Sequence, residues 1–446
     1  MKKIAYLVGS ALIVVGVIFA LLQGFKSGET EFEKELFSIA EDTYQFFIDY
    51  TDPNTGLTLD RVDIDGKVVE YSQTSPTNIA MYLVSTISAA EFDFISKQEA
   101  KEKIEVTLDS LQQMEKWNGL YYNWYYTEDA SLMTDWGEFI STVDNGWLTA
   151  ALVVVGQYFP DLASITDPLV DEMDYSHLYD PKIGQMRGGY DVSLGKVTDH
   201  HYGMLYSETR LASYVAIGKG DVPAEHWWKL YRTFPKEFDW QNQIPVGETK
   251  NYDGIDVFEG HYEYEGIKFV PSWGGSMFEA LMPPLFLNER ELGKQGLGLN
   301  NARHVQGQVA FAKKEGFEVW GFSPAAIVNR YNEFGVSSLG TEGYDDQATV
   351  TPHASILGLE YAPEAVEANI AMLKELGTFG EYGFYDTINL NTNEIAKSFL
   401  ALDQGMIMIS ISNFLNDGLI RKYFHADPIG KSPEYLLKEE VFSIGE

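Results

Sequence analysis

Glu208 occupies a position in which a carboxyl group could do acid–base chemistry. In the stretch YSETRLASYVAIGKGDVP, residues 206–223, apolar or small residues recur from Leu211 to Gly218 at i, i+3, i+4 and i+7. This spacing predicts a helix with one buried face, and Glu208 shares that face. A carboxyl near a core is either paired, here with Arg210 or with a helix amino end, or it has a raised pKa and can hold a proton.

Three aspartates stand at loop ends, where a second carboxylate could activate water. Asp144 in STVDNGW follows a strand-like run and precedes a predicted helix, which suits an acid at the mouth of a cavity. Asp386 in GFYD and Asp403 in LDQG are further loop or helix-start acids. Each of these aspartates could instead cap a helix amino end. An ionised carboxylate among them could draw a proton from water.

The stretch WNGLYYNWYY, residues 117–126, concentrates aromatic side chains in one predicted loop, and Trp117, Tyr122 and Trp124 belong to it. Flat rings bury a large area at a small entropic cost and also stack on sugar faces. These aromatic side chains could therefore either pack in the core or form the wall of a carbohydrate cleft, and both interpretations stay open.

The composition excludes several classes of function. The chain has 446 residues, a net charge of −34 and no cysteine. This charge argues against nucleic acid and disfavours any polyanionic ligand, whereas a neutral substrate is compatible with it. The missing cysteines exclude disulfides and thiolate chemistry. No HExxH, Walker or GxSxG motif occurs, and Asp60–Gly66 fails the calcium-loop spacing and reads as a polar turn. We expect neither a metal nor a cofactor.

The first residues carry a targeting signal. Lys2 and Lys3 precede an uncharged, mostly apolar run from residue 4 to 25, which is long enough to cross a bilayer as a helix. We expect an uncleaved membrane anchor in residues 1–29 with its amino end inside, so that the rest of the chain lies outside the cytoplasm. Secretion after signal cleavage is the alternative.

The remaining chain reads as a series of helices without a low-complexity linker. Periodicity and capping signals predict helices at 30–49, 76–93, 98–116, 145–157, 203–219, 223–233, 274–287, 300–315, 324–333, 352–360, 363–376, 393–399 and 402–419. Short strand-like pieces stand at 267–270 and 317–321. Since each helix needs another to cover its apolar face, the pattern favours an all-α toroid of helical hairpins. Two stacked α-helical domains are the alternative.

Several segments resemble the glycoamylase-like domain of bacterial cyclic β-1,2-glucan synthases and of related endo-β-1,2-glucanases. These are TSPTNIAMYLV at 74–84, STVDNGWL at 141–148, SETRLASYVAIGKGDVPAEHWW at 207–228, WGGSMFEALMP at 273–283, PHASILGLEYAPEAVEANI at 352–370, EYGFYD at 381–386, DQGM at 403–406 and YFHADP at 423–428. The resemblance implies an (α/α)6 barrel at 30–430, with a part similar to the DUF3131 family at 30–160 and a glycoamylase-like part at 161–430. Residues 431–446 are then a tail.

The resemblance also implies roles for single residues. Glu208 stands in the S-E-x-R motif whose glutamate is an acid/base carboxylate in this group, which makes it the candidate general acid. A second, nucleophilic glutamate of the retaining relatives follows a W-G-x-S run. Here that run starts at Trp320 and is followed by Pro324, which cannot attack an anomeric carbon. An inverting mechanism is therefore favoured, with Asp144 or the Asp345–Asp346 pair as the base.

The function expected from these observations is hydrolysis of a neutral glucan, β-1,2-linked by first preference, outside the cytoplasm. A binding protein without turnover, and a trimming or transfer partner of a membrane glycan synthase, are the alternatives. The expected substrate contacts are Trp117, Tyr122, Trp124, Trp273, Glu279, Trp320, Asp386 and Asp403.

Overall fold

The helices with the most continuous apolar sequences form the inside of the fold. The structure is a computed structural model that describes residues 30–136, 138–328 and 330–445. In α3, fifteen successive residues from Pro76 to Ala90 are buried, and Thr86 and Ser88 donate their hydroxyls to carbonyls one turn earlier. The inner helices are α3 (Pro76–Glu91), α5 (Thr142–Tyr158), α7 (Arg210–Lys219), α9 (Met277–Leu281), α12 (Pro352–Ile356) and α14 (Ala401–Leu415).

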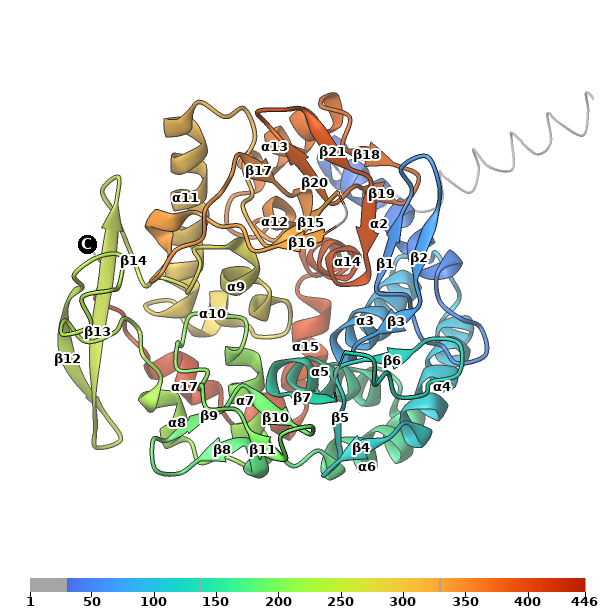
Figure 1. The fold of residues 1–446 in the computed structure, drawn as a ribbon, viewed down its shortest axis with the longest axis horizontal. Helices are drawn as coiled ribbons and strands as arrows, with labels where there is room; N and C mark the ends of the chain where they lie inside the picture. Colours follow the sequence, from blue (N-terminus) through green and yellow to red (C-terminus); the bar gives the residue numbers. More distant parts are fainter. Residues whose placement is uncertain (1–29, 137, 329, 446) are drawn as a thin grey trace, which may run out of the picture.

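More exposed helices cover this inner wall. They are α2 (Glu31–Asp49), α4 (Lys97–Gln113), α6 (Ala163–Glu172), α8 (Glu225–Lys229), α11 (Leu297–Glu315) and α13 (Pro363–Glu375). Each packs against the inner helix next to it in sequence, and α2 also packs against α14, which closes the ring (Figure 1). This alternation agrees with the predicted toroid of helical hairpins. The remaining helices are α10 (Glu289–Leu292), α15 (Leu419–Ala426), α16 (Pro428–Lys431) and α17 (Glu434–Glu439).

Side-chain caps begin three of the first helices, α2, α3 and α5. The Thr30 hydroxyl accepts from the Glu33 amide while the Glu33 carboxylate accepts from the Thr30 amide, which is a complete capping box. Ser75 caps α3, whose first residue is a proline, and Ser141 caps α5 by accepting from the Asp144 amide at 3.2 Å. Asp144 is thereby fixed in the first turn of α5.

Short strands stand among the loops of this mostly helical fold. The larger sheets are β2 (Val69–Tyr71) with β1 (Arg61–Asp63) and β22 (Ser398–Leu400), and β12 (Val246–Tyr252) with β13 (Ile255–Tyr264) and β14 (Ile267–Phe269). All of these pairs are antiparallel, with Arg61 opposite both Tyr71 and Leu400. The second sheet stands at the left edge of the ring in Figure 1.

The remaining strands join neighbouring loops. They are β3 (Gln73–Thr74) with β6 (Tyr125–Tyr126), β4 (Lys116–Trp117) with β5 (Leu120–Tyr121), β7 (Phe139–Ser141) with β10 (Gly189–Asp191) and β11 (Lys196–Val197), β8 (Tyr179–Asp180) with β9 (Gln185–Met186), β15 (Ala325–Ile327) with β16 (Arg330–Asn332), β17 (Thr349–Val350) with β20 (Thr387–Asn389) and β21 (Glu394–Ala396), and β18 (Phe379–Gly380) with β19 (Gly383–Phe384).

Four predicted segments differ from the structure. The predicted helices at 324–333 and 393–399 are strands, because their backbones pair with β-partners and this pairing outweighs local helix propensity. The stretch 317–321, which looked strand-like, has no strand. The helix predicted at 203–219 begins only at Arg210. Before it, the Leu205 amide donates to the Tyr231 carbonyl, so that the backbone there is already committed to another segment.

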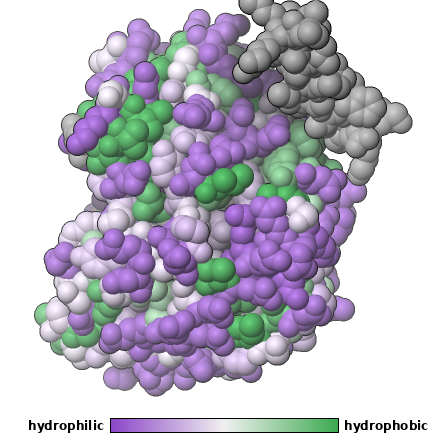
Figure 2. Space-filling model, turned by 90° about the vertical axis from the view of Figure 1, so that its right-hand side faces the viewer, coloured by the Kyte–Doolittle hydropathy of each residue, from purple (hydrophilic) through white to green (hydrophobic). Residues whose placement is uncertain are grey.

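The predicted anchor lies outside the described residues. Among those that are described, no single helix has the length and apolarity to cross a membrane, and one pair that passes together, Thr142–Tyr158 with Pro160–Leu178, is bent by 119°. The face drawn in Figure 2 is largely hydrophilic, with separate hydrophobic patches. In the predicted tail, Leu436 and Leu437 of α17 are buried, and Glu440 pairs with the buried Arg232.

Candidate active site

The amino ends of several inner helices open onto a common cavity of about 760 Å³. Its wall includes the first turns of α3, α5 and α9, the turn before α7 and the start of α14. The lining residues are Asp60, Arg61, Tyr71, Gln73, Ser75, Thr77, Asn78, Trp124, Trp136, Ser141, Val143, Asp144, Trp147, Tyr202, Glu208, Phe278, Arg330, Tyr331, Leu400 and Leu402. A cavity of this size accommodates a ligand of several hundred cubic ångströms.

Glu208 lies half-buried in this wall, in the turn before α7, and its neighbouring arginine does not neutralise it. Arg210 Nε lies 2.7 Å from Glu289 Oε1, and its other nitrogens donate to the carbonyls of Glu279 and Ala280. Of the two alternatives for Glu208, pairing with Arg210 is thus not realised, because Arg210 pairs with Glu289. Burial and the nearby charge of Glu279 raise the pKa of Glu208 to about 8, so that Glu208 holds its proton at neutral pH.

Glu279 is the source of that charge, because it has the hydrogen-bond donors that Glu208 lacks. Its carboxylate accepts from the Ser272 and Ser276 hydroxyls at 2.8 and 2.9 Å and from the Gly274 amide at 2.9 Å. Burial raises the pKa of Glu279, but these donors oppose the rise. Within the coupled pair we therefore assign the proton to Glu208 and the negative charge to Glu279.

Asp144 lies in the same cavity with two side chains that favour its ionised form. The Thr77 hydroxyl donates to Asp144 Oδ1 at 2.6 Å. Asn123, with its amide oriented so that both ends are satisfied, donates to Oδ2 at 3.0 Å and accepts from the Trp124 indole. Burial raises the pKa of Asp144, while its hydrogen bonds with Ser141 and Thr77 act in the opposite direction. The cavity thus holds a protonated glutamate and a hydrogen-bonded aspartate.

Aromatic and polar side chains missed in the sequence complete the cavity. The Trp136 ring meets the predicted Trp124 edge to face, with ring centroids 5.6 Å apart, and Trp136 is 61% exposed, which leaves its ring open to a ligand. Asp60, which reads as part of a polar turn in the sequence, accepts from the Asn78 amide at 2.8 Å and from Gln73 at 3.3 Å. No local signal distinguishes Asp60, because its partners come from β3 and α3.

Of the eight predicted substrate contacts only Trp124 is in the cavity wall, and the other seven, including four aromatic residues, lie elsewhere. Trp117 stacks on Tyr190 with ring centroids 4.3 Å apart. Tyr122 and Trp320 are buried, and the Trp320 backbone bonds to Asn369. Trp273 belongs to a separate aromatic group with Phe234 and Trp240. None of these four residues lines the cavity that holds Glu208.

The Asp345–Asp346 pair lies in a loop that is not part of the cavity wall. The two carboxylates accept from the backbone amides of Gln347 and Ala348, two residues further along in each case. They border a different surface pocket, together with Asn242 and Ser337. The structure thus brings Asp144, and not this pair, to the wall that holds Glu208.

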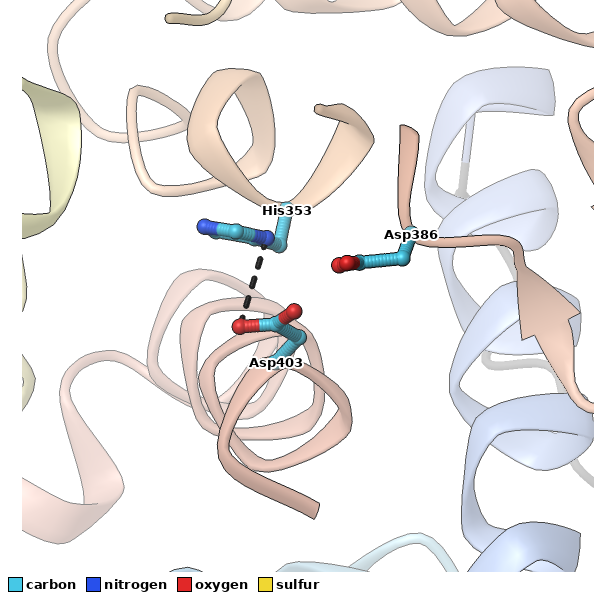
Figure 3. A group of neighbouring side chains, drawn as sticks. All are labelled: His353, Asp386 and Asp403. Atoms are coloured by element: carbon cyan, nitrogen blue, oxygen red, sulfur yellow. Dashed lines mark ion pairs between the residues drawn. The ribbon is translucent and has the colours of Figure 1, made fainter. Parts of the chain in front are cut away.

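Asp386 and Asp403 meet a histidine in the interior (Figure 3). Asp386 comes from the loop between β19 and β20, Asp403 from the first turn of α14 and His353 from that of α12. Burial, with the charge of Asp403, raises the pKa of Asp386 well above its usual value, and burial raises that of Asp403 to about 6. Burial lowers the pKa of His353 to about 4.

Two family models match the chain. The Glycoamylase model, described as "Putative glucoamylase", matches residues 200–428. The DUF3131 model, described as a protein of unknown function, matches residues 38–218. Together they span the ring of helices, and the junction of the two matches contains Glu208.

Curated relatives and solved structures are similar over most of the chain. The cyclic beta-(1,2)-glucan synthase NdvB of Rhizobium meliloti is 25% identical over 92% of this chain and 18% of its own length. The exo beta-1,2-glucooligosaccharide sophorohydrolase of Parabacteroides distasonis is 21% identical over 86% of this chain and 55% of its own. The chain thus spans about half or less of each. The endo-beta-1,2-glucanase structure from Chitinophaga pinensis, in complex with sophorotriose and glucose, is 19% identical with a TM-score of 0.73, over 91% of this chain and 98% of that one.

Proposed function

The chain belongs to the glycoamylase family, and from this premise we propose that it is a glycoside hydrolase that cleaves a β-1,2-linked glucan. The observation that carries the proposal is the cavity in which Glu208 has no arginine partner while Asp144 lines the same wall. A protonated and an ionisable carboxyl in one cavity are the two groups that glycoside hydrolysis requires.

Hydrolysis in this cavity would proceed in one displacement. Glu208 gives its proton to the glycosidic oxygen as the bond from that oxygen to the anomeric carbon breaks. A water molecule attacks the opposite face of the anomeric carbon, and Asp144 takes the proton that this water loses. The products are two saccharides, and the anomeric configuration is inverted. Pro324 follows Trp320–Ser323 at the place where the retaining relatives have a nucleophilic glutamate. Because proline has no carboxylate to form a covalent intermediate, this residue supports the single-step route.

The choice of substrate rests on the relatives and on the charge. The names of the two curated relatives and of the similar structure all specify β-1,2-linked glucose. A neutral glucan is compatible with a chain of net charge −34, whereas a polyanion would be repelled. The exposed ring of Trp136 and its neighbour Trp124 provide a surface on which a sugar ring can stack.

The test is turnover by the protein with β-1,2-, β-1,3-, β-1,4-, β-1,6- and α-linked glucans, followed by reducing ends and by the anomeric configuration of the first product. We expect turnover on the β-1,2-linked glucan alone, with inversion. Glu208→Gln and Asp144→Asn are expected to lose at least about a hundredfold in kcat. Asp346→Asn, which removes a carboxylate outside the cavity, is the comparison that separates the two candidates for the base.

Other outcomes decide between the alternatives. Binding without turnover in both wild type and Glu208→Gln would contradict the proposal and leave a glucan-binding protein. Retention of configuration would contradict the single displacement. A transfer product in place of free sugar would favour the alternative that the protein is a trimming or transfer partner of a glycan synthase. This alternative is considered because the chain is similar to part of such a synthase.

We also propose that residues 1–29 anchor the protein in the cell membrane, with the ring of helices outside the cytoplasm. Lys2 and Lys3 before the apolar run at 4–25 support this orientation. Fractionation of cells that express the full chain, and of cells that express residues 30–446, tests it. We expect the full chain, and not residues 30–446, to be found in the membrane fraction and to be accessible to external protease. A mature chain that begins near residue 30 would contradict the uncleaved anchor.

A further inference from the structure

Three side chains from separate parts of the chain converge on one buried point. In Figure 3, Asp386 and Asp403 direct their carboxylates toward the same space, and the near edge of the His353 ring faces it. One ligand-type atom from each lies within 4.8 Å of those of the other two. His353, Asp386 and Asp403 are only 2%, 3% and 3% exposed, so that water does not solvate them freely.

The polar atoms of this cluster are incompletely paired. Both Asp403 oxygens and Asp386 Oδ1 lack a hydrogen-bond partner among the described residues. Asp386 Oδ2 accepts a hydrogen bond from the Ala326 backbone amide, and His353 Nδ1 shares a hydrogen bond with the Thr351 hydroxyl. Buried carboxylates are normally paired or bound to a metal, since leaving them unpaired costs several kcal/mol. Two adjacent buried carboxyl groups without a cationic side chain either share a proton or bind a positive ion.

The spacing of the donors matches the edges of a coordination shell. His353 Nδ1 lies 3.4 Å from Asp403 Oδ1 and 2.8 Å from Thr351 Oγ1. Ligands about 2.0–2.2 Å from a tetrahedral or octahedral ion stand roughly 3 to 3.6 Å from one another. The Asp386 carboxylate needs only a small movement to join this group, because one of its oxygens already lies within 4.8 Å of the other two ligand atoms.

We propose that His353, Asp386 and Asp403 bind one divalent metal ion, with the Thr351 hydroxyl beside it. Two carboxylates balance the ion's charge. One imidazole nitrogen among oxygen donors favours Zn²⁺ or Mn²⁺ over Ca²⁺ and Mg²⁺, which prefer oxygen alone. The ion would tie the first turns of α12 and α14 to the loop before β20. Leu400 and Leu402, on either side of the first residue of α14, belong to the cavity wall, so that the ion would support that wall.

Metal binding to the full chain is measurable without any assay of activity. The protein is stripped with EDTA, dialysed against Zn²⁺ or Mn²⁺ and examined for bound metal by mass spectrometry and for the change in Tm. Co²⁺ serves as a coloured substitute whose visible spectrum reports coordination in the wild-type protein. Asp403→Asn and His353→Gln remove ligands with little change in volume, and Glu367→Gln, an exposed carboxylate on α13, is the control.

We expect about one equivalent of Zn²⁺ or Mn²⁺ in the wild type and in Glu367→Gln, with a rise in Tm on binding, and at least tenfold weaker binding in the two ligand variants. Without metal, Asp403→Asn should melt no lower than the stripped wild type, because it removes a repulsive charge. Absence of uptake by the wild type, a Co²⁺ spectrum of the free aqueous ion, or uptake unchanged in both ligand variants would overturn the proposal. None of these results depends on hydrolysis of a glucan.

Discussion

Glu208 and Glu279 show that the role of a carboxyl is set by the donors around it. Glu279 is held by two serine hydroxyls and a backbone amide, whereas for Glu208 burial and the like charge of Glu279 outweigh a backbone hydrogen bond and the charge of Arg210. The sequence predicts an acid at position 208, because a carboxylate that precedes an apolar stripe is conspicuous. It could not predict that Glu279 raises the pKa of this acid, since the two residues lie on different helical hairpins and no local pattern connects them.

Glu208→Gln should stabilise the protein at high pH while it removes activity. Because the folded-state pKa of Glu208 is raised to about 8, the unfolded chain loses this proton at lower pH than the folded protein does. The stabilisation of the folded state by protonated Glu208 is therefore fully present below about pH 4.5 and is lost as the pH rises through 8. Thermal melts should show little difference between variant and wild type at pH 5, and a higher Tm for the variant at pH 9. A lower Tm at pH 9 would contradict the raised pKa.

Glu279→Gln should move the alkaline limb of the pH–rate profile to lower pH. Without the negative charge of Glu279, Glu208 gives up its proton more readily, so that less of the enzyme carries a protonated acid at neutral pH. The measurement is kcat on the β-1,2-linked glucan as a function of pH. Glu279→Asp, which keeps the charge, is the matched control and should move the limb less. An unmoved limb in Glu279→Gln, with native circular dichroism, would show that this charge does not reach Glu208.

Among the elements, the long amphipathic helices were predictable and the loop strands were not. Helices such as α4 and α13 combine a capping residue or an initial proline with a regular apolar stripe, and these signals are local. The strands β15 and β22 exist because they pair with partners, and for β22 the partner β1 lies more than three hundred residues away. Part of the cavity wall could not be predicted for the same reason. Asp60 and Trp136 reach it from loops whose course depends on such pairings.

Gly146→Ala tests how closely α5 and α7 must approach each other to place the two carboxyls. A Cβ atom at position 146 would stand 2.5 Å from the Cβ and 2.7 Å from the Cα of Ala212, so that the helices must separate. We expect a loss of about 1–3 kcal/mol in unfolding free energy, measured with denaturant, and a lower kcat, because Asp144 and Glu208 stand at the starts of these helices. Gly445→Ala, where the new Cβ has open space, is the control. Equal stability of both variants would contradict the tight contact.

At the scale of the whole molecule, the helical ring is predictable because helix after helix has an apolar face that needs a partner. The helices α3, α5 and α14, which lie inside the ring, are apolar on nearly all sides. The division near residue 160, which the resemblance implies between two parts of one barrel, falls between α5 and α6, and these two helices pack against each other.

A chain that ends at residue 400 tests whether the ring is one cooperative unit. It would lack α14, which packs against α2, α3 and α12, and would expose the apolar surfaces that α14 covers. We expect no cooperative thermal transition and a tendency to aggregate, whereas the full chain should unfold in a single transition. A sharp transition together with a native near-ultraviolet spectrum in the shortened chain would mean that the remaining hairpins fold without closure.

The contact between α2 and α14 has a consequence for the time course of biosynthesis. Asp49 ends one helix and Ala401 begins the other, so that 352 positions separate them (401 − 49). At about 5–20 residues per second, a ribosome needs roughly 20 to 70 seconds to make this stretch. Throughout that interval the apolar face of α2 that α14 will cover has no such neighbour. The nascent chain therefore passes through a prolonged stage in which α14 cannot yet shield that surface from other chains.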